Sequence, residues 1–121
     1  MGFTNYSPSS SRAEAIGTAA GVATTTAAPS TATDGIDTKQ HRFVNCWIKL
    51  VGGTSANFTV YLYRSAIGWI QYTDVPETTL TTANGGGVIQ IEPRGADRVY
   101  VRCTSVTGPP THSMAFYGST Y

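Results

Sequence analysis

From His41 onward, apolar and polar residues alternate along the chain with a period of two. This period is typical of β-strands that have one face in a core and the other face outside it. In the clearest run, residues 43–50, the apolar side carries Val44, Cys46, Ile48 and Leu50. Further strands are predicted over residues 58–63, 69–72, 79–83, 88–91, 98–105 and 113–117.

Turn signals separate these runs and contain the residues that turns favour, such as Gly52-Gly53 and Gly108-Pro109. Asn84-Gly85 is typical of a tight β-hairpin turn that leads into the strand after it. No segment has a convincing helical pattern. The sequence therefore predicts an all-β fold, an antiparallel β-sandwich or small jelly roll of roughly six or seven strands over residues 41–121.

Residues 1–40 have a different composition. They hold 8 Ala, 8 Thr, 5 Ser and 4 Gly, and only 2 of the 13 aromatic residues of the chain. Such a segment has too few large apolar side chains to form a core, so we expect an extended or disordered N-terminal arm. The remaining domain has only about 80 residues, a size at which burial against a partner or oligomerisation often adds stability.

The charge of the chain excludes some classes of function. It has 8 Lys and Arg against 7 Asp and Glu, a formal net charge of +1, which argues against a dedicated nucleic-acid-binding protein. The longest uncharged stretch, residues 15–33, is rich in Thr and contains Pro29, so it is too polar for a membrane span. We therefore expect neither a nucleic acid nor a membrane as partner.

Candidate chemistry is sparse. Cys46 and Cys103 both fall on the apolar side of their strands, which allows a bridge between core strands but favours two buried free thiols. The spacing of the cysteines and histidines matches no common metal site, and no nucleophile motif is present. The glycines after Asn84 precede a strand, so they predict a flexible hairpin tip and not a phosphate loop. We expect a protein that is not an enzyme, without catalytic, metal-binding or cofactor-binding residues and without a cofactor.

The most informative feature is a set of aromatic residues on the side of the strands opposite the aliphatic residues. A monomeric sandwich normally keeps this side polar. Three explanations stay open: this side is covered by a neighbouring subunit or by the arm, the aromatic rings form a platform for sugars, or the inside and outside of some strands are reversed. Arg98 and Arg102 share a face with Tyr100, which suits a protein interface better than single-stranded nucleic acid. The candidate interface residues are Trp47, Tyr61, Tyr63, Arg98, Tyr100, Arg102 and Tyr117.

The Ala/Thr/Ser-rich arm before a small β-domain, together with the run from Gly95 to Gly108 (GADRVYVRCTSVTG), resembles small virion proteins of tailed bacteriophages, such as head decoration (cement) and accessory proteins. The resemblance implies a structural role in which the arm and the aromatic face bind neighbouring subunits. The implied partners are the major capsid protein or adjacent structural subunits, with further copies of the chain as a homo-oligomer on the particle. The implied location is the virion, assembled in the host cytoplasm.

We therefore expect a capsid decoration or cement subunit. Tail, collar and fibre-attachment components of the same particle fit the sequence as well. The alternative from a different class is a carbohydrate-binding module that uses exposed Trp and Tyr side chains.

Overall fold

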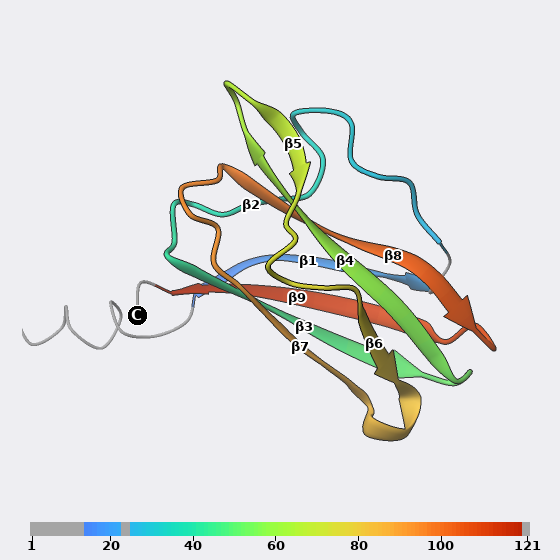
Figure 1. Ribbon diagram of the computed structural model, residues 1–121. Helices are drawn as coiled ribbons and strands as arrows, with labels where there is room; N and C mark the ends of the chain where they lie inside the picture. Colours follow the sequence, from blue (N-terminus) through green and yellow to red (C-terminus); the bar gives the residue numbers. More distant parts are fainter. Residues whose placement is uncertain (1–13, 23–24, 120–121) are drawn as a thin grey trace, which may run out of the picture.

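The computed structural model describes residues 14–22 and 25–119, the side chains of residues 20–22 excepted, and shows two antiparallel sheets packed face to face (Figure 1). The first sheet has the order β1 (Glu14–Val22), β9 (Thr111–Ser119), β3 (Phe43–Val51) and β7 (Gly86–Ile91). The second has the order β2 (Ile36–Asp37), β8 (Arg98–Thr107), β4 (Ser55–Arg64) and β5 (Gly68–Gln71), and β6 (Thr78–Thr81) also pairs with β4.

The strand pairs are nested along the chain. β1 pairs with β9, β2 with β8, β3 with β7, and β4 with β5 and β6. This is the arrangement of a long hairpin wound into two sheets, the strand order of a jelly roll. The prediction of an all-β antiparallel sandwich is confirmed.

The core lies between the sheets and consists of the inward side chains that the alternation predicts. Phe58, Val60 and Val99 of the second sheet are fully buried, as are Val44 and Ile91 of the first. Cys46 and Cys103 contribute from the two opposite sheets, and both are buried free thiols.

The sequence assigns residues 1–40 to an arm and starts the domain at residue 41, but the sandwich includes strands from before this boundary. β1 pairs with β9 along its whole length, with a bulge between Ala15 and Gly17. A side chain at Gly17 would come within 2.7 Å of Ile36, so a small residue suits this position. A pair between Glu14 and His41, 2.7 Å apart, joins the start of β1 to the segment before β3. Residues 1–13 lie outside the described residues.

The hairpin predicted at Asn84-Gly85 is wrong. β6 before it pairs with β4, and β7 after it pairs with β3, so the two strands belong to different sheets. The connection is a short 3-10 helix, η2 (Thr82–Asn84), and Gly85 follows it with a φ of 77°, a left-handed conformation that glycine adopts readily. The turn signal therefore marks the change of direction correctly but not the pairing of the strands.

Candidate functional site

The aromatic side chains that the alternation places outside the core do lie outside it, but on two different faces. Trp47 and Tyr117 lie on the outer face of the first sheet, because their neighbours Cys46, Ile48 and Phe116 are buried between the sheets. The other five candidate interface residues lie on the outer face of the second sheet: Tyr61, Tyr63, Arg98, Tyr100 and Arg102. The explanation in which inside and outside are reversed does not hold for these strands.

The outer face of the second sheet carries a continuous aromatic cluster. Trp69 of β5 lies opposite Tyr63 of β4, with the ring centroids 5.1 Å apart. Trp69 also meets Tyr100 of β8 at 6.2 Å, and Tyr100 meets Tyr61 at 6.5 Å, both in edge-to-face contacts. Edge-to-face pairs at such distances are favourable, so the cluster is a preformed surface.

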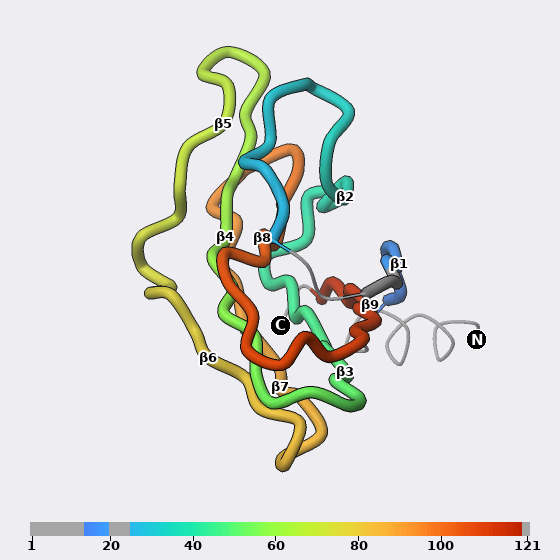
Figure 2. Tube along the Cα trace, turned by 90° about the vertical axis from the view of Figure 1, so that its right-hand side faces the viewer, coloured from blue at the N-terminus to red at the C-terminus, as the bar shows by residue number. Residues whose placement is uncertain are grey.

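Residues 25–35, which we call the covering segment, lie against this surface. The segment starts beside β8 and ends at β2 (Figure 2). The Thr26 amide donates to the Cys103 carbonyl at 2.9 Å, which fixes the start of the segment at the edge of β8. Trp69 Nε1 donates to the carbonyl of Thr31 at 2.8 Å, and the Tyr100 hydroxyl to that of Ala27 at 3.2 Å.

The two arginines hold the covering segment in the same way. Arg98 Nε donates to the Asp34 carbonyl at 2.7 Å, and its Nη2 donates to the carbonyls of Gly35 at 2.8 Å and Thr33 at 3.2 Å. Arg102 Nε donates to the Thr26 carbonyl at 2.8 Å. The two guanidinium groups bind backbone carbonyls of the covering segment and not its side chains. This binding therefore depends on an extended main chain more than on the sequence of the segment.

Within the covering segment, Asp34 closes a turn. Its Oδ2 accepts hydrogen bonds from the amides of Ser30 at 2.9 Å and Thr31 at 3.0 Å. These two bonds lower the pKa of the Asp34 carboxyl, so the turn keeps its ionised acceptor down to acidic pH. The turn presents the Thr31 carbonyl to Trp69.

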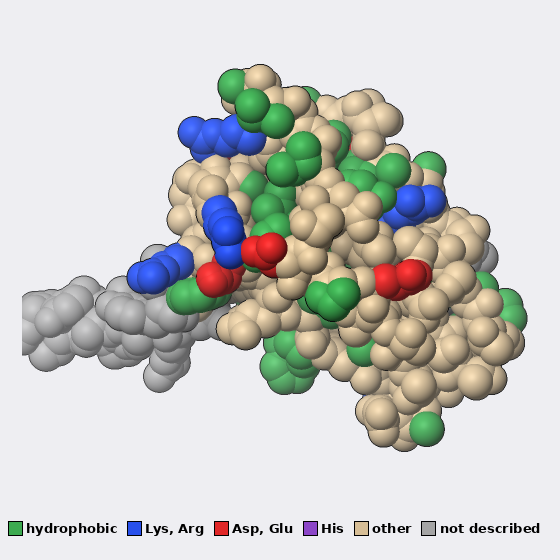
Figure 3. Space-filling view, in the orientation of Figure 1, with side chains coloured by type: hydrophobic (Ala, Val, Ile, Leu, Met, Phe, Trp, Pro, Cys, Tyr) green, Lys and Arg blue, Asp and Glu red, His purple; other side chains and the backbone are tan. Residues whose placement is uncertain are grey.

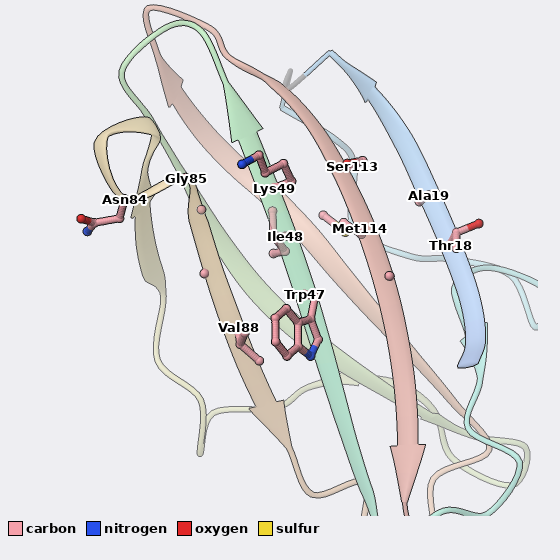
Figure 4. A pocket seen from close by; sticks show the side chains of 13 residues that line it. Thr18, Ala19, Trp47, Ile48, Lys49, Asn84, Gly85, Val88, Ser113 and Met114 are labelled. Atoms are coloured by element: carbon pink, nitrogen blue, oxygen red, sulfur yellow. The ribbon is translucent and has the colours of Figure 1, made fainter. Parts of the chain in front are cut away.

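On the outer face of the first sheet, Trp47 is 58 % exposed. Its cross-strand neighbours are Ala115 of β9 and Val88 of β7, and Thr18 of β1 follows in the same row. Because Ala115 and Thr18 are small, the indole stands in a shallow depression of about 610 Å³ (Figure 4). Tyr117, half-buried, is the next outward residue of β9 beyond Ala115.

A third exposed surface surrounds the connection between β4 and β5. Ile67 is 71 % exposed and Ile70 is 56 % exposed, and both line a depression of about 700 Å³. Arg94 and Asp74, paired at 2.7 Å, lie at the same depression. Figure 3 shows hydrophobic side chains gathered around β5 at the top of this face, with Lys or Arg side chains beside them.

The groups with acid–base or metal-binding chemistry are scattered. No cluster of three His, Cys, Asp or Glu side chains suited to a metal ion occurs among the described residues. Burial raises the pKa of the Cys46 and Cys103 thiols. Burial lowers the pKa of His112, whose ring lies 6.4 Å from that of Phe58. In the described part of the chain, no helix is long and apolar enough to span a membrane.

Two important side chains were absent from the sequence-based set. Trp69 belongs to the aromatic cluster because it lies opposite Tyr63 in the hairpin of β4 and β5, and this pairing could have identified it. Lys49, two residues after Trp47, shares the outer face of the first sheet, as the alternation of β3 already indicates. In comparisons with known proteins, no family model, curated protein or solved structure matches the chain.

Proposed function

We propose that this protein is a structural subunit of a virus particle, and most directly a decoration or cement subunit of the capsid. The observation that carries the proposal is the covering segment, an extended Ala- and Thr-rich stretch held on a sheet face through its own backbone carbonyls. Backbone contacts of this kind suit an extended arm of the same copy or of a neighbouring copy, because every residue of an arm has a carbonyl group that can accept a hydrogen bond. Such contacts fix position along a surface and need few specific side chains on the arm.

The fold and the sequence add support of a weaker kind. Jelly rolls are frequent in viral capsid proteins and also in lectins, so the strand order is compatible with the proposal but does not select it. The resemblance to small virion proteins of tailed phages favours the capsid over the lectin class. The proposed partners are the major capsid protein or adjacent subunits, and the proposed location is the virion.

Sedimentation of a lysate from the native source, with the protein detected by mass spectrometry, tests the proposal. We expect the protein to migrate with a megadalton particle and to stay with it at high salt, because apolar and backbone contacts are little affected by screening. Recovery only in the low-mass soluble fractions would overturn the proposal.

A deletion separates the role of the arm from the stability of the domain. It must be limited to residues 1–13, because deletion of residues 1–40 also removes β1 and β2 from the two sheets. We expect the shortened protein to keep the thermal unfolding midpoint of the full chain and to lose incorporation into particles. Normal incorporation would show that these residues have no part in assembly.

A further inference from the structure

We propose that the depression around Trp47 binds an acidic saccharide, a sugar chain that carries carboxylate groups. This binding site lies on the outer face of the first sheet, opposite the face that holds the covering segment. It is independent of the proposed role in assembly, and either proposal stands if the other fails.

The first part of the argument is the exposed indole. An aromatic ring with one open face packs well against the apolar C–H face of a pyranose ring, because both surfaces are flat. Trp47 has such a face, since Ala115 and Thr18 beside it are too short to cover the ring. The depression of about 610 Å³ has the size of a small-ligand site, which typically measures about 300–1,000 Å³.

Gly86 lines the depression and lies opposite Lys49 in the neighbouring strand. A side chain there would place its Cβ 1.9 Å from the backbone oxygen of Ile48, and the φ of Gly86 is +116°. Only glycine fits this backbone. At this position of β7, opposite Lys49, no side chain can therefore project into the depression.

The second part of the argument is charge. Lys49 and Trp47 point to the same side of β3, about 7 Å apart along the strand. The Lys49 ammonium reaches the rim near Gly85, where a Cβ added to this glycine would lie 3.6 Å from Nζ (Figure 4). Lys49 is the sole charged residue among the described side chains that line the depression, and its ammonium has no ion pair or hydrogen bond with another described residue. A carboxylate on a sugar stacked over the indole would meet a free cation and no protein anion.

Polar groups at the rim complete the recognition of a sugar. Asn84 and Ser113 line the same depression, and the side chain of neither has a hydrogen-bond partner among the described residues. The Ser113 hydroxyl suits the hydroxyl groups of a sugar, which both donate and accept, whereas the Asn84 amide points away from Trp47 in Figure 4 and would have to rotate to reach the ligand. A hydrocarbon ligand would leave these groups unpaired.

A second protein copy fits this face less well. The large exposed apolar side chains described on it are Trp47, Val51 and Val88. Stable protein interfaces bury about 800 Å² on each partner and rely on several anchoring side chains. One indole among small residues is a narrow anchor for such an area but sufficient for one or two sugar rings.

The test is a titration of the full-length protein with an oligogalacturonate, and separately with a neutral malto-oligosaccharide, followed by tryptophan fluorescence and calorimetry. We expect saturable binding of the acidic sugar that weakens in about 0.5 M sodium chloride. Trp47→Ala should lose binding, and Trp47→Phe should retain part of it. Lys49→Met should lower the affinity for the acidic sugar about three- to tenfold and leave the affinity for the neutral sugar unchanged. Val51→Ala, an exposed change on the same face outside the depression, is the matched control.

Three results would overturn the proposal. The first is no saturable signal with the acidic sugar up to about 10 mM. The second is equal affinity for the acidic and the neutral sugar, which would remove the charge argument. The third is a Trp47→Ala protein that binds sugar normally but sediments as a smaller species than the wild type, which would identify the face as a protein interface. Urea unfolding of each variant shows whether a loss of binding comes from a loss of folding.

Discussion

Arg98 is the side chain that holds the covering segment most firmly, so its removal is the sharpest test of how that segment is bound. The guanidinium donates to three successive carbonyls, those of Thr33, Asp34 and Gly35. Arg98→Met keeps most of the aliphatic length and removes all three donors. The aromatic contacts of Trp69 stay in place, so the substitution separates charge-assisted hydrogen bonding from apolar packing.

The loss of unfolding free energy expected for Arg98→Met follows from how far the three hydrogen bonds are exposed to water. A hydrogen bond to a charged group contributes about 1.5–3 kcal/mol when buried and less when water competes for it. The bonds to Asp34 and Gly35 are partly buried, and the bond to Thr33 is exposed. We expect Arg98→Met to lower the free energy of unfolding by about 2–3 kcal/mol in total. With a urea m-value of about 1.5 kcal/mol per molar, the midpoint falls by about 1.3–2 M.

Two measurements check this prediction. Urea unfolding followed by tryptophan fluorescence gives the midpoint, and limited digestion with elastase, with the cut sites read by mass spectrometry, shows whether the covering segment opens first. Arg94→Met is the matched control, because Arg94 is 65 % exposed and makes one surface ion pair with Asp74. If both variants keep the wild-type midpoint and the wild-type rate of cleavage within residues 25–35, the segment is not held by these hydrogen bonds.

Three further predictions concern the core and the turns. Gly53→Ala should prevent or strongly weaken folding, because the new Cβ would lie 1.6 Å from a backbone oxygen of the neighbouring turn. Gly52→Ala is the control: its Cβ would have no atom within 4 Å, so the free energy of unfolding, measured by thermal denaturation, should fall by only about 1 kcal/mol. The unfolding free energy should decrease as pH falls below about 6.5, because the pKa of His112 is lowered in the folded protein and the unfolded chain therefore takes up a proton first. In urea titrations, the His112→Gln variant should show a smaller decrease than the wild type between about pH 7 and pH 5. An equal decrease in both proteins would assign the effect to other groups. Cys46 and Cys103 should react with Ellman's reagent only after unfolding in urea, since both are buried and have raised pKa values, and rapid reaction of the native protein would contradict this.

The strands with strong alternation were predictable from the sequence, and the weak ones were not. β3 and β4 have apolar residues at every second position, so their existence and their inner faces follow from the pattern. Among its described side chains, β1 packs Ile16 against the core. It is an edge strand, and its main stabilisation is backbone pairing with β9. Pairing of this sort depends on a partner about 100 residues away, which no local pattern contains.

The sequence predicted which side of the sheet the candidate site residues face, but not which part of the protein lies over them. Alternation placed Tyr61, Tyr63 and Tyr100 outside the core correctly, yet it contains no information on what lies over them. The covering segment binds through carbonyl groups, which every residue has, so its sequence does not reveal the contact. Whether these side chains also contact a neighbouring subunit stays a prediction.

The nested pairing also sets the timing of folding during synthesis. Glu14 pairs with Gly118, so β1 leaves the ribosome about 5–20 s before β9 at an elongation rate of about 5–20 residues per second. Through that interval the strand has no partner in its own sheet. Its sequence, EAIGTAAGV, is poor in large apolar residues, and a strand of this kind has little tendency to aggregate with other nascent chains while it waits. The weak side-chain pattern that made β1 hard to predict thus suits a strand that is synthesised first and pairs only when β9, the last strand, has been made.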